Sequence, residues 1–165
     1  IVRGKENKPV EYGIKAHINQ VGGINIIEYA SYNAFNECKR LKESVLRHET
    51  MIGECTHIAA DGIYPTNENR TLLREKSIQH NFCRKGRGKD DKATKQMKGI
   101  LNKERSTRLE GSFGTEKEHY LLRKIKARSQ KTELIWLHFG VYTANVVRIS
   151  NRRQENSLQA QKLAA

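Results

Sequence analysis

Hydrophobic and polar residues alternate near the start of the chain. Five apolar residues occupy every second position there: Val10, Tyr12, Ile14, Ala16 and Ile18. This period of two predicts a strand with one buried face. A turn with two glycines follows at 21–23, and a second apolar stretch covers 24–29. Residues 9–32 are therefore predicted to form an antiparallel hairpin.

The hydrophobic period changes in the segments that follow. Apolar side chains recur at spacings of three and four in residues 36–48, which predicts an amphipathic helix. A short stretch at 56–60 predicts a strand that runs up to Asp61. A second helix is predicted over 67–76, with Thr66 as its N-cap. Residues 78–83 predict a further strand.

The second half of the chain has mainly helical patterns. A helix is predicted at about 101–122 from the spacing of Leu109, Phe113 and Tyr120. Residues 133–149 are apolar on nearly all sides, which predicts a buried helix, with a pair of strands as the alternative. Trp136 and Phe139 are expected in its core. The polar tail, 151–165, is expected to fray.

This order of elements predicts an α/β domain over residues 1–150, with helices packed on a sheet. In such sheets functional groups gather at the carboxyl ends of strands. Asp61 occupies a position of this kind, directly after a predicted buried strand. A lone aspartate there can also cap a turn, so Asp61 alone does not identify a site.

Charge narrows the choice of partner. The chain has 31 Lys and Arg against 18 Asp and Glu, a net charge of +13, and +10 of this lies in residues 84–131. Such a field favours a polyanion, with nucleic acid first and ribosomal RNA or an anionic membrane as rivals. No apolar run reaches the roughly 20 residues of a membrane span. The three cysteines form no CxxC pair, which argues against a thiolate zinc site.

Two stretches of the basic region stand out. Four of the cations in the stretch RKGRGKDDK are suited to contacts with a DNA backbone: Arg84, Lys85, Arg87 and Lys89. Further along, the segment 105–117 places Glu110 among basic residues and Lys117 seven residues later. Seven residues are almost two α-helical turns, so these two side chains are predicted to share a face. Glu116 and Glu118 would point elsewhere.

Three motifs in this order resemble the DDE transposases of bacterial insertion sequences. They are ADGIY followed by TNENR, the loop FCRKGRGK, and RLEGSFGTEKEHYLLRKIKAR, and the resemblance covers residues 2–149. It implies a ribonuclease H-like fold, in which a mixed sheet of a hairpin and parallel strands is flanked by helices. It also implies a cytoplasmic, nucleoid-associated protein that acts on transposon ends and target DNA, as a homo-oligomer.

The resemblance implies that Asp61 and Glu110 are catalytic carboxylates that hold two Mg²⁺ ions, with Mn²⁺ as a substitute. Hard oxygen ligands suit such ions, and two of them can promote in-line displacement at phosphorus. Arg105, Arg108 and Lys117 are the DNA contacts it implies near the site. For Lys117 the alternative is an ordinary solvated lysine.

The chain departs from the family pattern in two ways. The family's first aspartate precedes the hairpin, and the chain starts at Ile1, so we expect an N-terminally incomplete catalytic domain; neither Glu6 nor Glu11 is assigned that role. The family's arginine four residues before the glutamate is replaced by Ser106. Arg105 and Arg108 are near, but α-helical geometry places neither on the face of Glu110. Two alternatives stay open: a catalytically inactive DNA-binding remnant, and a basic RNA-binding protein.

Overall fold

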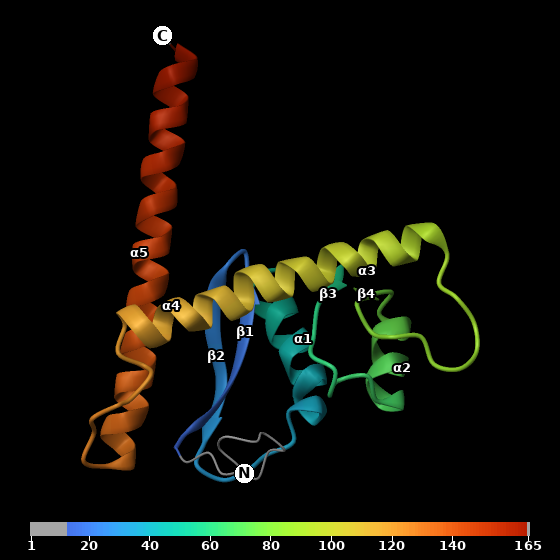
Figure 1. The fold of residues 1–165 in the computed structure, drawn as a ribbon, viewed down its shortest axis with the longest axis horizontal. Helices are drawn as coiled ribbons and strands as arrows, with labels where there is room; N and C mark the ends of the chain where they lie inside the picture. The colour runs from blue at the N-terminus through green and yellow to red at the C-terminus, as the bar shows by residue number, and fades with distance from the viewer. Residues whose placement is uncertain (1–12, 165) are drawn as a thin grey trace. The chain divides into compact units, whose positions relative to one another are not determined.

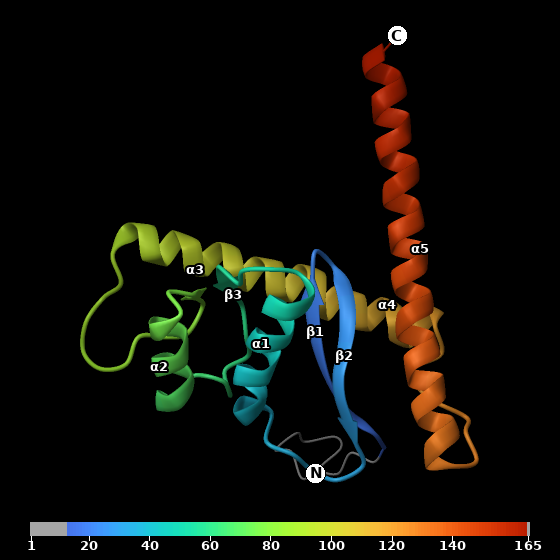
Figure 2. The ribbon, with the colours of Figure 1, turned by 180° about the vertical axis from the view of Figure 1, so that it is seen from behind.

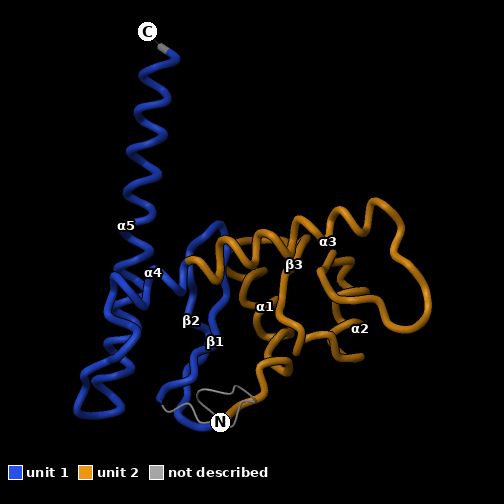
Figure 3. The backbone as a smooth tube through the Cα atoms, viewed as in Figure 1, with its two compact units in different colours: residues 1–33, 112–165 blue, residues 34–111 orange. Residues whose placement is uncertain are grey.

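The computed structural model describes residues 13–164 and divides into two compact units (Figure 3). One unit comprises residues 1–33 and 112–165, and the other comprises residues 34–111. Five residues named above lie outside the described part of the chain: Ile1, Glu6, Val10, Glu11 and Tyr12.

The first unit contains the predicted hairpin, which is confirmed. Strand β1 (Lys15–Val21) pairs antiparallel with β2 (Ile24–Ser31), and an irregularity in register falls between His17 and Ile18. The turn consists of Gly22 and Gly23, with φ of 55° and 80°. Positive φ at both central residues is the geometry of a type I′ turn, which glycine adopts without steric cost.

Two helices complete this unit. They are α4 (Gly111–His119) and α5 (Gln130–Ala164), and α5 packs against β2. The helical interpretation of 133–149 is confirmed, but its burial on nearly all sides is not. Leu137 and Val141 are buried against Ile27 of the hairpin, whereas Phe139 is 71% exposed and Trp136 is 36% exposed. One face of α5 therefore packs, and the placement of Trp136 and Phe139 in the core was wrong.

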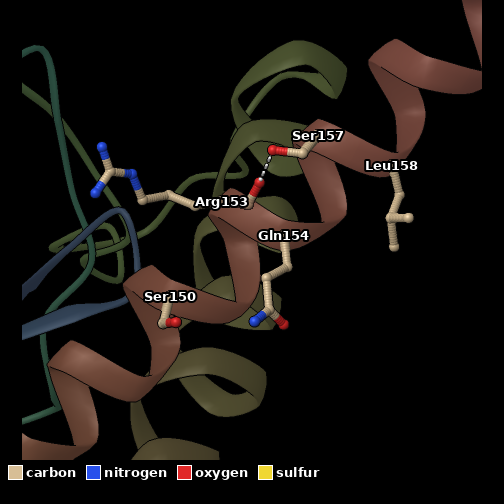
Figure 4. Close-up of a pocket in the computed structure, with 5 residues that line it drawn as sticks. All are labelled: Ser150, Arg153, Gln154, Ser157 and Leu158. Carbon is tan, nitrogen blue, oxygen red and sulfur yellow. Dashed lines mark hydrogen bonds between the residues drawn. The ribbon is translucent and has the colours of Figure 1, made fainter.

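The polar tail is helical rather than frayed. It forms the second half of α5, which continues without a break to residue 164 (Figures 1 and 2). A shallow hollow on this half is lined by residues of α5 alone: Ser150, Arg153, Gln154, Ser157 and Leu158 (Figure 4). Within it Ser157 Oγ donates to the carbonyl of Arg153 at 2.8 Å, a bond internal to the helix.

A buried polar network joins the hairpin to both helices of this unit. Asn25, which is fully buried, donates from Nδ2 to Ser112 Oγ at 2.9 Å and to Glu116 Oε1 at 2.5 Å. Its backbone exchanges two hydrogen bonds with the side-chain amide of Asn145. Glu116 is thus a structural carboxylate, in agreement with its exclusion from the predicted metal site.

The second unit is built from short elements. In chain order they are η1 (Glu37–Arg40), α1 (Leu41–Met51), β3 (His57–Ile58), α2 (Asn67–Glu75), β4 (Gln79–His80), α3 (Lys92–Glu104) and η2 (Arg105–Glu110). Leu41, Val45, Leu73 and Phe82 form the centre of its hydrophobic core. Tyr64 also packs there, so it is a core residue. The predicted cap is confirmed, because Thr66 Oγ1 accepts from the backbone N–H of Asn69.

The parallel strands are present but much shorter than predicted. Strands β3 and β4 pair in parallel over two residues each, where 56–60 and 78–83 were expected. Within residues 13–164 the hairpin and this pair form two separate two-stranded sheets, in place of the single mixed sheet expected. The fold is mixed α/β, with a hairpin, a parallel pair and flanking helices. No helix in the described part of the chain is both long and apolar enough to cross a membrane.

Candidate active site

Asp61 lies on a tight turn just after β3. The carbonyl of Asp61 accepts from the backbone N–H of Tyr64 at 3.0 Å, and its Oδ1 accepts from the N–H of Gly62 at 2.7 Å. The buried ring of Tyr64 anchors the other end of the turn. The carboxylate itself is 62% exposed. A hydrogen-bonded turn therefore presents the carboxylate to solvent.

Asn81 fixes the backbone that leads into this turn. Its Oδ1 accepts from the N–H of Ala60 at 2.9 Å, and its Nδ2 donates to the carbonyl of Ala60 at 2.9 Å. The same Nδ2 donates to Asn102 Oδ1 of α3 at 2.8 Å. The pairing of β3 with β4 ends at His80, and the next residue, Asn81, bonds to Ala60 through its side chain instead of its backbone. The same side chain links the start of the turn to α3. Sequence reasoning missed Asn81 and Asn102, since single asparagines carry no pattern that would mark them.

Glu110 reaches the neighbourhood of Asp61 through Arg105. One guanidinium nitrogen of Arg105, Nη1, lies 3.1 Å from Glu110 Oε1 and 3.8 Å from Asp61 Oδ1. The distance between the two carboxylate oxygens therefore cannot exceed the sum of these two distances. The Glu110 side chain is 56% exposed, and that of Arg105 is 26% exposed. Two acidic groups separated by 48 residues of sequence thus converge on one cation.

The contact between Arg105 and Glu110 depends on a π-helical turn. Residues 105–110, between α3 and α4, form the π-helix η2, in which hydrogen bonds connect residues five apart. Residues i and i+5 are neighbours on such a turn, whereas α-helical geometry separates them. The expectation that Arg105 lies off the face of Glu110 was therefore wrong, because it assumed an α-helix. Arg108 pairs with Glu104 one turn earlier, at 2.5 Å.

The basic loop is exposed and partly held by its own side chains. Arg84 donates from Nη1 to the carbonyl of Lys89 at 2.9 Å and packs over Gly88, where a Cβ would meet the guanidinium at 3.1 Å. Lys85 donates to Asn67 Oδ1 at 3.0 Å, and Arg87 is exposed. Arg84 thus shapes the loop that presents the cations. Lys117 is an exposed residue of α4, in the other unit.

The donor set at Asp61 and Glu110 fits a hard divalent cation. Mg²⁺ commonly binds through one or two carboxylates, with waters and substrate phosphates in its other positions. Both carboxylates are accessible, and each lies within 4 Å of the same guanidinium nitrogen of Arg105. Among residues 13–164 no group of three or more His, Cys, Asp or Glu side chains gathers in a metal-binding arrangement. A second ion would therefore need a further ligand from outside this pair.

No protein-family model, curated protein or solved structure matches the chain.

Proposed function

We propose that the chain is part of a DDE transposase catalytic domain with a ribonuclease H-like fold, which cuts and joins DNA strands with Mg²⁺ or Mn²⁺. The observation that carries this proposal is the convergence of Asp61 and Glu110 on Arg105. Two exposed carboxylates held beside a concentrated positive field suit metal-dependent chemistry on phosphodiesters. The motif resemblance names the same two carboxylates independently of their distance in space.

In this proposal each residue has a distinct task. Asp61 and Glu110 hold the divalent ion, and the Asn81 amide keeps the Asp61 turn in place. The bound ion would supply electrophilic stabilisation of the phosphodiester oxygens during an in-line displacement at phosphorus. The cations of the basic loop, Arg84, Lys85, Arg87 and Lys89, bind the DNA backbone without reading its sequence. The third carboxylate that the family requires is not assigned among the described residues.

The decisive experiment compares isosteric amide variants. Asp61→Asn and Glu110→Gln in the full chain should reduce Mn²⁺-dependent cleavage of a labelled duplex at least about 100-fold. DNA affinity should stay within about threefold, because the loop cations are intact. Glu104→Gln is the matched control, since Glu104 pairs with Arg108 on the same helical run. Cleavage retained by either site variant would refute the catalytic assignment.

A non-catalytic DNA-binding protein is the second candidate. The position of the Arg105 guanidinium favours it, because this group already compensates both carboxylates without a metal. Such a protein would bind DNA with the same affinity in EDTA and in Mn²⁺ and would leave a labelled duplex intact. Tight binding to RNA in preference to DNA would point instead to the RNA-binding alternative.

A further inference from the structure

We propose that Arg105 occupies the cation position between Asp61 and Glu110 and is displaced when a divalent ion binds there. This inference rests on the proposed function, since it concerns the same pair of carboxylates. It assigns Arg105 as a positioning residue that sets metal affinity, in place of a simple contact to DNA.

The first support is geometric. A single nitrogen of Arg105 lies within ion-pair distance of both carboxylates, at 3.1 Å from Glu110 and 3.8 Å from Asp61. A cation shared in this way compensates the repulsion that two neighbouring carboxylates would otherwise have. A metal ion held by Asp61 and Glu110 would compete with the guanidinium for the same two carboxylates. The two cations are therefore mutually exclusive at this position.

The second support is the exposure of the contact. More than half of each carboxylate side chain is accessible, and the long side chain of Arg105 is partly so. Exposed ion pairs are individually weak, so water and a competing ion can separate this one. Arg105 can thus hold the pair in the free protein without blocking it permanently.

The third support is the π-helical turn. This rare geometry is what brings Arg105 and Glu110, five residues apart, onto one face. A displaced guanidinium remains beside the site, and its planar set of donors matches a phosphate. Metal binding frees Arg105 to bind a DNA phosphate, and phosphate binding frees the two carboxylates to bind metal. The two binding events should therefore favour each other.

Titrations of the full chain with Mn²⁺ alone test the proposal, with free Mn²⁺ followed by electron paramagnetic resonance. Arg105→Ala should bind Mn²⁺ with a Kd roughly threefold to thirtyfold lower than the wild type, the range expected from removing two exposed ion pairs. Arg105→Lys, which keeps the charge but not the planar fork, should fall in between. The thermal shift produced by Mn²⁺ should increase in the same order.

Lys103→Ala is the matched control. It removes one positive charge two residues away, where a helix directs the side chain to a different face. Its Mn²⁺ affinity should stay close to that of the wild type. An equal gain in both variants would mean that net charge alone sets the affinity, and the proposal would be overturned.

Asp61→Asn distinguishes a failure of the proposed metal site from a failure of the proposed role of Arg105. If it abolishes Mn²⁺ binding while Arg105→Ala has no effect, the metal site stands and the role of Arg105 falls. If Mn²⁺ binding is absent from the wild type and from Arg105→Ala, or is insensitive to Asp61→Asn, the metal site itself is refuted. A lower Kd in Arg105→Ala that is lost again in the Asp61→Asn double variant supports both.

Discussion

The side-chain amide of Asn81 holds both backbone hydrogen-bonding groups of Ala60, each at 2.9 Å. In a parallel pair these groups would bond to the backbone of the neighbouring strand, but β3 and β4 pair over only two residues. The amide therefore continues the contact between these two segments to Ala60, the residue before Asp61. We infer that the orientation of the Asp61 carboxylate depends on these hydrogen bonds from the Asn81 side chain.

Replacing Asn81 should consequently affect both stability and metal binding. Asn81→Ala leaves the polar groups of Ala60 without their partner, which costs about 1–3 kcal/mol in the free energy of unfolding. We also expect weaker Mn²⁺ binding, because the Asp61 turn loses its anchor. Urea denaturation and Mn²⁺ titration measure the two effects separately.

Asn102→Ala is the dissecting variant for this prediction. It removes only the 2.8 Å bond between Asn81 and α3 and leaves the bonds to Ala60 in place. Its Mn²⁺ affinity should be closer to that of the wild type than the affinity of Asn81→Ala. Unchanged metal binding in Asn81→Ala would show that the turn is rigid without the amide.

Gly111, directly after Glu110, should tolerate alanine in the folded chain. Its φ of −62° is helical, and among the described residues a Cβ there would meet no atom within 4 Å apart from its chain neighbours and its own helix backbone. Gly111→Ala should therefore stabilise the protein by about 0.4–1 kcal/mol, through loss of backbone freedom in the unfolded chain. The added methyl group should nevertheless slow DNA cleavage if the duplex approaches the helix beside Glu110.

Gly99→Ala provides the matched comparison, because Gly99 is also helical with open space at its Cβ. Both variants should show similar thermal stabilisation, and only Gly111→Ala should cleave more slowly. Equal cleavage rates would argue against close contact between the DNA and this part of the helix.

Features that repeat with the period of a strand or a helix could be predicted from the sequence, whereas features that depend on tertiary contacts could not. The hairpin was predictable because the alternating residues Ile14, Ala16 and Ile18 pack, partly buried, against the core of the first unit. The helix of residues 41–51 was predictable because Leu41 and Val45, four residues apart, are both buried. The exposed side of α5 could not be predicted, because the identity of a hydrophobic residue such as Phe139 does not show whether another element covers it. Composition alone also gave no sign that the tail would continue α5.

In the candidate site, too, some features could be predicted from the sequence and others could not. Asp61 and Glu110 could be named from motifs, but their relation could not be obtained from an α-helical projection, since the chain between Arg105 and Glu110 is π-helical. Asn81 acts through tertiary hydrogen bonds, which have no periodicity in sequence. Whether side chains from separate segments meet depends on such local geometry.

The basic loop should contribute to DNA affinity in a salt-dependent manner. Each cation that contacts a phosphate adds about 0.9 to the slope of log K against log salt concentration. Arg87→Ala should therefore reduce this slope by about one, whereas Lys42→Ala, an exposed cation on α1, should not. Arg84→Ala should have a larger effect, because Arg84 also holds the loop through the carbonyl of Lys89. Fluorescence anisotropy at several salt concentrations measures these slopes, and identical slopes in all variants would exclude the loop from the interface.

Glu116 should make stability depend on pH in the first unit. Burial raises the pKa of Glu116 above its ordinary value of 4.5, and the bond from Asn25 and the charge of Arg148 only partly offset this. The folded state therefore holds the proton more tightly than the unfolded state, so the contribution to stability is full below pH 4.5 and is lost as pH rises through the folded pKa. Glu116→Gln keeps the acceptor for Asn25 without the buried charge, and it should be more stable than the wild type at neutral pH but not at acidic pH. Urea midpoints at neutral and acidic pH measure this difference. Glu118→Gln, at an exposed position, is the control for loss of one negative charge. The prediction is contradicted if the wild type becomes more stable than Glu116→Gln as pH rises.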